Sequence, residues 1–427
     1  MKTNSQNVRS IAGLLIIFLT SFIVVPVWAQ SDEPVTTIRG KIIDQKTEKP
    51  LVFASVLVVN TGVGTVSNNE GDFILKVPVS LKDNAIRFSF MGYKSLSYKL
   101  SDLKPDNNIV SLSLETINIK DVVVRANDPV SLIKRAIENV PENYGTAPYL
   151  CTAFYREVIM QNRQYAGVAE AVLNIYKASY NNTSANDRIK VFKGRKSQDV
   201  TRMDTLIFKL QGGHYVALLL DLAKNPETFM DENYFNSYVY QPVTITNIEG
   251  RETYVIEFAQ KREIDDAFYD GRLYLDVNSL AIKKAEFWIS PKGLPFADRY
   301  LVKRKPADTK VKTVSGFYSV DYREINGRWT LNHVRYEVKF KVDKKHHWFS
   351  KTYTSTVDLA ITDKDTVNVT KFKLSESLKP NQVFIDHVSD YYDENFWGNY
   401  NIIKPEEPIE EAIKRISKRI KKYQSSL

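Results

Sequence analysis

Few side chains in this 427-residue sequence have the types and spacing that catalysis requires. A zinc-dependent peptidase needs a histidine and a glutamate close together, a second histidine far downstream and a glutamate that acts as a base. None of the five histidines begins a His-x-x-Glu motif, and no histidine follows the nearest imitation, which pairs His387 with Asp390. A Gly-x-Ser-x-Gly motif and a glycine-rich phosphate loop are also absent. The sequence therefore predicts a protein that is not an enzyme and that uses no metal or cofactor.

Two further groups of reactive or charged residues have simpler explanations. The single cysteine, Cys151, cannot form an internal disulfide and lies among apolar neighbours, which favours a buried thiol over a nucleophile. Glu263, Asp265 and Asp266 form an acidic cluster shortly before the turn residue Gly271. This position is typical of a solvated loop, with a weak cation site as the alternative.

The elements that would position any site begin with a series of short strands in residues 37–115. Phe73, Leu75 and Val77 alternate with their neighbours, and the same two-residue period recurs in residues 86–90. A period of two predicts strands with one buried face, as in an antiparallel sandwich.

The same residues closely resemble the carboxypeptidase regulatory-like domain that is common in envelope proteins of the Bacteroidetes. Four motifs carry the resemblance: Gly-Lys-Ile-Ile-Asp at 40–44, Pro-Leu-Val-Phe-Ala-Ser-Val at 50–56, Gly-Thr-Val-Ser-Asn-Asn-Glu-Gly-Asp-Phe at 64–73 and Gly-Tyr at 92–93. The resemblance implies a prealbumin-like β-sandwich without catalytic activity. It therefore bears on the cellular location and the binding partners of the protein more than on any catalytic activity.

A linker strand is expected over residues 116–127, followed by a larger domain over residues 128–375. Asp128 and Pro129 are typical of a helix cap and first turn, and the amphipathic run after them is expected to end at Pro141. Long strands follow, and the clearest hairpin is turned by Asn-Gly at residues 326–327. The expected strands are 149–158 with 165–176, 243–248 with 253–258, 273–277 with 282–289, 317–325 with 328–342, and 351–361.

This strand order resembles the lipoprotein-carrier fold, an open half-barrel that holds helices in its concavity. The specific likeness is Asp-Gly-Arg-Leu-Tyr-Leu-Asp-Val-Asn-Ser-Leu-Ala-Ile-Lys-Lys-Ala-Glu at residues 270–286. The layout, including the tail at residues 391–397, also resembles the soluble front of a Bacteroidetes outer-membrane family whose longer members append a barrel. The predicted fold is mainly β, with a sandwich followed by a large curved antiparallel sheet and a few packed helices.

One short helix supplies the candidate ligand-binding residues. The segment from His214 to Ala223 is apolar on more than one face, so its side chains cannot all meet one sheet. Val216, Leu219 and Leu220 are therefore expected to contact a second apolar surface, either a bound ligand or another helix. The high aromatic content, 12%, fits core packing in a large sheet, with an aromatic ligand platform as the alternative.

The two ends of the sequence carry signals of their own. Residues 1–29 combine basic residues, a short apolar core and a small-residue cleavage site, as in a secretory signal peptide, with a retained anchor as the alternative. Residues 376–427 form a tail with a C-terminal amphipathic helix in which Ile409, Ile413, Ile416 and Ile420 share one face. That stripe, flanked by lysines and arginines, is expected to pack on the protein or to lie on an anionic membrane.

These observations predict an exported, non-catalytic protein of the periplasm or outer membrane. A binding or accessory role, with a lipid, lipoprotein or peptide as ligand, follows from the resemblance to the carrier fold. The alternative is a structural or assembly module that engages a protein partner, and a peptidase-associated protein is a third possibility. The net charge of +9 is scattered along the chain, so it does not indicate a nucleic-acid partner.

Overall fold

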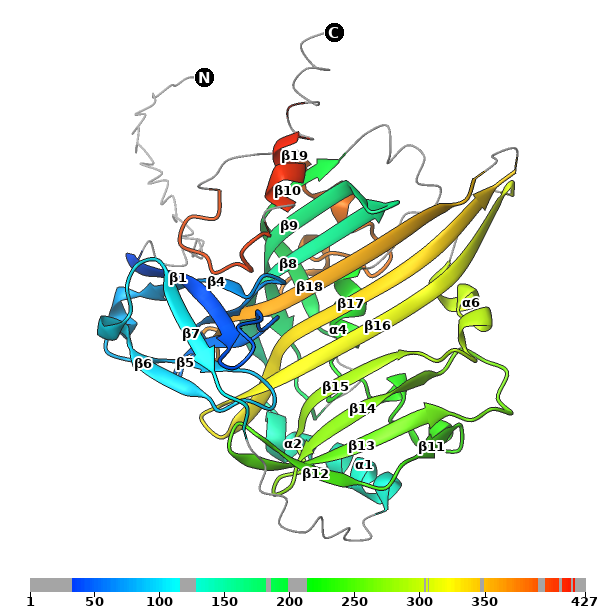
Figure 1. Cartoon of the computed structure of the whole chain (residues 1–427), viewed down its shortest axis with the longest axis horizontal. Coiled ribbons are helices and arrows are strands. Elements are labelled where there is room, and N and C mark those ends of the chain that lie inside the picture. The colour runs from blue at the N-terminus through cyan, green and yellow to red at the C-terminus, as the bar shows by residue number, and fades with distance from the viewer. Residues whose placement is uncertain are drawn as a thin grey trace, which may run out of the picture. The chain divides into compact units, whose positions relative to one another are not determined.

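Two small sheets form the first part of the described chain (Figure 1). One has the strand order β4-β1-β7 and the other the order β3-β2-β5-β6. Their elements are β1 (Val35–Asp44), β2 (Ser55–Val58), β3 (Gly64–Val66), β4 (Asp72–Pro78), η1 (Val79–Leu81), β5 (Ala85–Ser89), β6 (Leu96–Lys99), η2 (Leu100–Asp102) and β7 (Asn108–Leu112). The computed structural model describes residues 33–115, 128–181, 186–198, 213–302, 305, 307–345, 349–390, 396–406, 409–415 and 418.

The two small sheets share one apolar core, which identifies them as a sandwich. Phe73, Leu75 and Val77 of β4 are fully buried in the same cluster as Ile86 and Phe88 of β5. Residues between them along each strand are less buried. The predicted alternation is therefore confirmed for both strands, and it explains why the residues on the other face are free to meet a second part of the chain.

The rest of the fold is built on one 12-stranded sheet, here called the large sheet. Its order is β11-β13-β14-β15-β16-β17-β18-β8-β9-β10-β19, with β12 paired to β13. All neighbours are antiparallel apart from β10 and β19. Its strands are β8 (Tyr149–Gln161), β9 (Gln164–Lys177), β10 (Arg188–Gln198), β11 (Tyr238–Tyr240), β12 (Thr244–Ile248), β13 (Arg251–Gln260), β14 (Tyr269–Asp276), β15 (Ile282–Ile289), β16 (Thr309–Ile325), β17 (Arg328–Lys344), β18 (Lys351–Asp365) and β19 (Ser389–Asp390).

The four predicted hairpins are all present in the large sheet. The turn between β16 and β17 is the clearest, because Asn326 and Gly327 both have positive φ, 50° and 75°. The mainly β fold with an open antiparallel sheet is therefore the one that the sequence predicted. β18 pairs with β8, so a strand near the end of the chain lies beside the first strand of this sheet.

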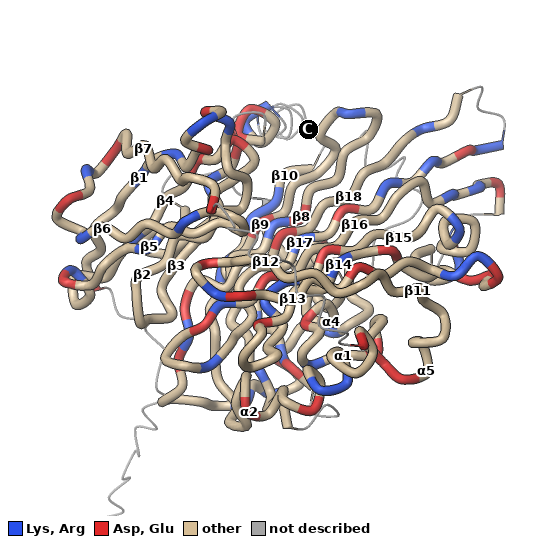
Figure 2. Tube along the Cα trace, turned by 60° about the horizontal axis from the view of Figure 1, so that its bottom comes forward, with Lys and Arg blue, Asp and Glu red and all other residues tan. Residues whose placement is uncertain are grey.

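Short helices cover one side of the large sheet, as Figure 2 shows for α1, α2, α4 and α5. They are α1 (Pro129–Glu138), α2 (Val140–Tyr144), α4 (Gly213–Leu219), η3 (Pro226–Thr228), α5 (Glu232–Phe235), η4 (Leu294–Phe296), α6 (Asp298–Leu301), η5 (Leu374–Glu376) and η6 (Phe384–His387). The side that they cover is called the inner face of the large sheet, and the opposite side the outer face.

Two helix boundaries differ from the prediction. Asp128 caps α1 as expected, with its carboxylate accepting from the Ser131 N–H. Pro141 does not end the helical run, because it lies in the first turn of a second helix that begins at Val140, where its missing N–H is tolerated. α4 stops at Leu219, four residues before the expected Ala223. The chain turns there and brings the Asp221 carboxylate to the side chains of Lys177, Tyr180 and Tyr322.

The tail joins the sandwich to the outer face of the large sheet. Trp397, Ile402 and Ile403 lie in one apolar cluster with Val66 of β3 and Phe154 of β8. Hydrogen bonds accompany this packing, from the Thr65 hydroxyl to the Ile402 carbonyl and from the Lys76 N–H to the Asn401 side chain. Residues 34–427 accordingly form one compact unit.

The C-terminal helix begins on the protein itself. Residues 409–415 are helical, and Ile409 and Ile413 are buried against Val158 of β8 and Val168 of β9. Of the two expectations for the apolar stripe, packing on the protein therefore holds for Ile409 and Ile413. Ile416 and Ile420 lie outside the described residues. The expected signal peptide and the linker strand at 116–127 also lie outside them. Within the described part of the chain, no helix has the length and apolar character needed to cross a membrane.

Candidate functional site

The inner face of the large sheet is largely filled by the chain's own helices. Leu132 and Ile133 of α1 and Ala217 and Leu218 of α4 are buried in the same cluster as side chains from nearly every long strand. α4 contacts β17 and β18, and α2 contacts β17. A carrier of the kind that the sequence suggested needs space on this face beyond what side chains occupy.

The sequence-predicted residues lie at the edge of this packed region. Leu220 is buried and Val216 is half-buried against the main core, whereas Leu219 is 38% exposed. None of the three lines either of the two cavities described below. Their proposed contact with a ligand therefore stays a prediction, centred on Leu219 because its side chain is the most accessible.

A hollow lies on the inner face, at the end where β14, β15 and β16 meet η3, α5 and α6. It has a volume of about 240 Å³ and is called the aromatic hollow. Its lining residues are Glu227, Thr228, Tyr234, Asp266, Ala267, Phe268, Tyr269, Ile289, Ala297, Tyr300, Leu301 and Tyr318. Sequence reasoning raised an aromatic platform only as an alternative to packing, and named none of these residues.

Edge-to-face ring contacts hold the walls of the aromatic hollow. The rings of Tyr269 and Tyr318 are 5.8 Å apart at 85°, and those of Tyr234 and Phe268 are 5.7 Å apart at 63°. Burial raises the pKa of Tyr269 to about 12, so this phenol stays neutral. At the rim, Tyr300 donates a hydrogen bond of 2.8 Å to Asp266. Such a wall offers apolar and aromatic contact with a few polar groups at its mouth.

A buried acid and a histidine lie near α4 but do not form a catalytic pair in a cleft. Burial raises the pKa of Glu157 to about 7, and its carboxylate accepts a 3.0 Å hydrogen bond from Tyr155. Burial lowers the pKa of His214 to about 4, and its Nε2 lies 3.2 Å from the Lys379 carbonyl oxygen. Neither residue lines the aromatic hollow or the cleft described next, so a reaction at this pair has no substrate access through either.

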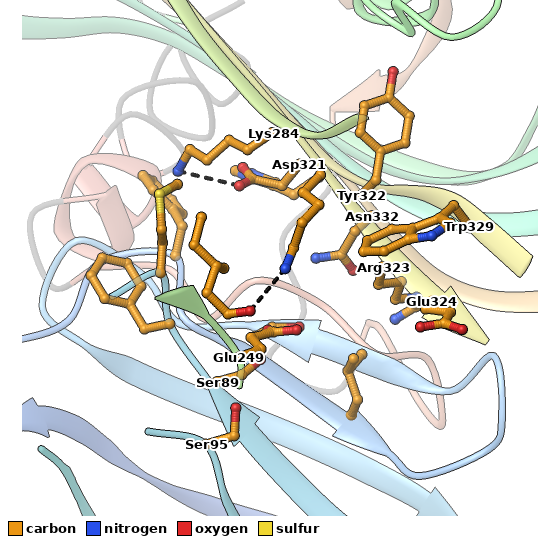
Figure 3. Close-up of a pocket in the computed structure, with 18 of the residues that line it drawn as sticks. Ser89, Ser95, Glu249, Lys284, Asp321, Tyr322, Arg323, Glu324, Trp329 and Asn332 are labelled. Atoms are coloured by element: carbon orange, nitrogen blue, oxygen red, sulfur yellow. Dashed lines mark hydrogen bonds and ion pairs between the residues drawn. The ribbon is translucent and has the colours of Figure 1, made fainter. Parts of the chain in front are cut away.

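A second cavity, larger than the aromatic hollow, lies between the sandwich and the outer face of the large sheet (Figure 3). It has a volume of about 560 Å³ and is called the inter-sheet cleft. β2 and β5 supply Ser55, Leu57, Arg87 and Ser89 from the sandwich side. β15, β16 and β17 supply the opposite wall, with Lys283, Lys284, Glu286, Phe317, Ser319, Asp321, Arg323, Trp329, His333 and Arg335.

Lys284 and Arg335, two of the cations that line the inter-sheet cleft, are neutralised by carboxylates within the protein. Lys284 lies 3.2 Å from the carboxylate of Asp321, as the dashed line in Figure 3 shows. Arg335 donates from Nη1 to both oxygens of Asp358 at 2.8 and 2.9 Å. These pairs fix the side chains that carry them, so they are part of the wall and not free donors.

The other candidate groups have the simple environments that the sequence suggested. Asp265 pairs with Lys292 at 2.7 Å, and Asp266 accepts from Tyr300, so both acids already have partners. Cys151 is buried, and its burial raises the pKa of the thiol to about 12, which keeps it protonated and unreactive. Among the described residues, no group of three or more His, Cys, Asp or Glu side chains has the arrangement of a metal site.

Residues 38–124 match the model of the CarboxypepD_reg-like domain. This match covers the sandwich and confirms the resemblance stated for that part of the sequence, while the Bacteroidetes origin stays a prediction. No curated protein matches the chain significantly.

Several solved structures align with the chain, all of those compared at low similarity, and two of them serve as examples. One is a DUF1329 family protein from Desulfovibrio piger, with 12% identity, a TM-score of 0.26 and coverage of 59% of this chain and 100% of that one. The other is a LolA superfamily protein from Nitrosomonas europaea, with 13% identity, a TM-score of 0.21 and coverage of 58% and 96%. TM-scores this low do not establish a shared fold, so the architecture rests on the strand order and register given above.

Proposed function

We propose that this protein is a non-catalytic binding protein of the cell envelope, and that the aromatic hollow binds the apolar chain of a lipid, lipoprotein or peptide. The observation that carries the proposal is the hollow itself. The described side chains leave a cavity at this end of the inner face, and five of its lining residues are tyrosine or phenylalanine. A preformed apolar cavity binds apolar ligands because little surface must be exposed or reorganised to fill it.

The cellular location is part of the same proposal. The apolar run near the N-terminus has the length and flanks of an export signal, and the CarboxypepD_reg-like match agrees with an envelope protein. We therefore propose that the chain is exported and acts in the periplasm or at the outer membrane.

The alternative function is an assembly module that binds a protein partner through a sheet edge or through the C-terminal helix. The packing of Ile409 and Ile413 on β8 and β9 removes the first part of that helix from such an interface. The geometry therefore favours ligand binding at the inner face over partner binding by this helix.

Uptake of a fluorescent fatty acid by the full chain tests the proposed function. Thr228 is half-buried and lines the aromatic hollow, so Thr228→Trp places a large ring where the ligand is expected. We expect this variant to lose most of the fluorescence increase and to keep the thermal midpoint of the wild type. Thr244→Trp is the matched control, because Thr244 is exposed on β12 and lines neither cavity.

A second variant separates the aromatic hollow from the sequence-predicted site. Leu219→Asp adds a charge at the accessible position of α4, outside the hollow. Loss of uptake in Leu219→Asp but not in Thr228→Trp would move the ligand to α4 and overturn the assignment to the hollow. If the wild type takes up no probe, the carrier interpretation fails and the assembly role becomes the better explanation.

A further inference from the structure

The inter-sheet cleft contains positive charge that the protein does not neutralise. Six lysine and arginine side chains line it, against four acids. Lys284 and Arg335 have the carboxylate partners given above, and Arg251 lies 2.5 Å from Glu324. Among the described residues, Arg87 and Arg323 have no ion-pair partner within 4.0 Å.

Arg323 is the most unusual of these side chains, because it is buried with most of its donors unused. It is 5% exposed, and its Nη2 donates to the Gly62 carbonyl at 2.6 Å. Its Nε and Nη1 are buried and have no hydrogen-bond partner in the described structure. Buried donors are almost always satisfied in folded proteins, so two free ones on a single guanidinium indicate a missing acceptor.

Strand geometry brings Arg87 to the opposite wall of the same cleft. In the pairing of β2 with β5, Leu57 lies opposite Arg87 and Ser55 opposite Ser89, so all four side chains project from one face. This is the face turned away from the sandwich core, and all four residues line the cleft. The Nε of Arg87 and the hydroxyl of Ser55 are also buried without a partner in the described part of the chain.

The two guanidinium groups act on one another across the cleft. The pKa of Arg323 is lowered to about 10, chiefly by burial; Asp363 opposes this shift, and the positive charge of Arg87 makes a smaller contribution in the same direction as burial. The absence of a side chain at Gly64 gives the Arg323 guanidinium its space, since a Cβ there would lie 2.9 Å from Nη1. Both residues line the same cleft, and an anion bound between the two guanidinium groups would offset the repulsion between them.

We propose that the inter-sheet cleft is a second binding site, and that Arg87 and Arg323 hold the phosphate or carboxylate group of a small organic anion. A guanidinium presents paired N–H donors that match the oxygens of either group. This site is separate from the aromatic hollow, which lies on the other face of the large sheet and shares no lining residue with it.

The size and walls of the cleft indicate that the anion belongs to a larger molecule. A volume of about 560 Å³ exceeds what a single phosphate or carboxylate fills, and it falls within the ~300–1,000 Å³ range typical of small-molecule sites. Phe53, Phe317 and Trp329 supply aromatic surface in the lining. The ring of Phe53 is fixed by stacking on His333 at 5.0 Å and by Arg335 above it at 4.7 Å.

Thermal-shift and calorimetric titrations of the full chain test this site with phosphate, phenyl phosphate and benzoate, against sodium chloride at equal ionic strength. We expect phenyl phosphate to bind more tightly than phosphate, because its ring adds contact with the aromatic wall. Benzoate distinguishes a carboxylate ligand from a phosphate ligand. Arg87→Gln and Arg323→Gln should each weaken binding at least about tenfold, the loss expected for a charge-assisted hydrogen bond.

The variants also separate a binding role from a structural one. Arg323→Gln loses the bond to the Gly62 carbonyl, so its unliganded midpoint should fall. For Arg87→Gln, removal of an unpaired positive charge should leave the unliganded midpoint unchanged or higher, while the ligand-induced shift is lost. Arg39→Gln, on the other sheet of the sandwich and outside the cleft, should bind like the wild type. Equal binding by Arg87→Gln, or no anion that exceeds chloride in the wild type, would overturn the proposal.

Discussion

Two buried glutamates on neighbouring strands of the large sheet show how strongly the surroundings decide what a carboxylate does. Glu157 of β8 points to the inner face, and Glu170 of β9 points to the outer face. Both are 1% exposed. Burial raises the pKa of Glu157 to about 7, whereas for Glu170 the charges of Arg156 and Arg195 outweigh the burial that raises the pKa and lower it overall.

The outer-face carboxylate is fully compensated. Its two oxygens lie 2.8 Å from Arg156 Nε and 2.8 Å from Arg195 Nη2. Arg156 also donates to the Ile403 carbonyl of the tail at 2.7 Å. These contacts join β8, β9, β10 and the tail, and they occupy both carboxylate oxygens of Glu170, so this carboxylate has no free acceptor for a ligand.

The comparison also explains why the inter-sheet cleft stands out. On the same outer face, the buried guanidinium groups of Arg156 and Arg195 both contact the Glu170 carboxylate, whereas the buried guanidinium of Arg323 has two nitrogens, Nε and Nη1, without a hydrogen-bond partner in the described structure. An unmatched buried guanidinium is therefore better explained by a ligand than by packing.

Removal of the Glu170 charge should have the largest effect on stability. Glu170→Gln removes the carboxylate that both buried guanidinium groups of Arg156 and Arg195 contact at 2.8 Å, and breaking comparable buried pairs costs about 3–5 kcal/mol. Guanidinium chloride unfolding at pH 7, followed by circular dichroism, measures this loss. The control is Glu376→Gln, which breaks an exposed pair with Lys190 and should leave the midpoint close to the wild type. Equal midpoints for the two variants would show that the network does not stabilise the fold.

Glu157, the acid on the inner face, should instead make the free energy of unfolding depend on pH. Because the folded pKa of Glu157 is about 7, above the unfolded value of 4.5, the folded state binds the proton more tightly. The stability from this group is present below pH 4.5 and is lost as the pH rises towards 7. Relative to the wild type, Glu157→Gln should therefore gain roughly 2–3 kcal/mol between these pH values.

Urea unfolding at a series of pH values measures that difference, and the opposing contribution of His214 cancels because both proteins contain it. Tyr155→Phe sharpens the test, since the lost hydrogen bond had lowered the pKa of Glu157. In Tyr155→Phe, the pH range over which the stability contribution of Glu157 is lost should therefore shift to higher pH. A difference between wild type and Glu157→Gln that stays constant from pH 4.5 to 8 would contradict the raised pKa.

The fold could be predicted because its signals are local. Strand alternation around Phe73 and the Asn326-Gly327 turn each depend on a few consecutive residues, and both are confirmed. The end of α4 was predicted wrongly because the partners of Asp221 come from distant strands. The sequence shows that the helix is apolar, but it does not show which distant side chains contact the residues at its end.

The sites were harder to predict for a related reason. Leu219 and its neighbours have the same residue types whether they meet a core or a ligand, so their apolar character does not decide between the two. The alternation in β5 predicted that Arg87 lies on the less buried face of the strand, and the structure places it there, partly buried. The alternation did not predict that its Nε would be buried without a hydrogen-bond partner. Nothing in one sequence predicts that Arg323, far along the chain, lines the same cleft.

Removal of the Glu406 charge, which the tail places near Arg156, should have the smallest effect on the free energy of unfolding. Glu406 accepts from the Asn69 side chain at 2.9 Å, but its other oxygen is 3.9 Å from Arg156 Nη1, so it contributes little to neutralising that guanidinium. Glu406→Gln keeps an acceptor for Asn69 and should cost about 1 kcal/mol in guanidinium chloride unfolding. Because both carboxylates act on Arg156, the double variant with Glu170→Gln should be non-additive. A loss in Glu406→Gln as large as that in Glu170→Gln would mean that the tail carboxylate, despite its longer distance, neutralises Arg156 as fully as Glu170 does.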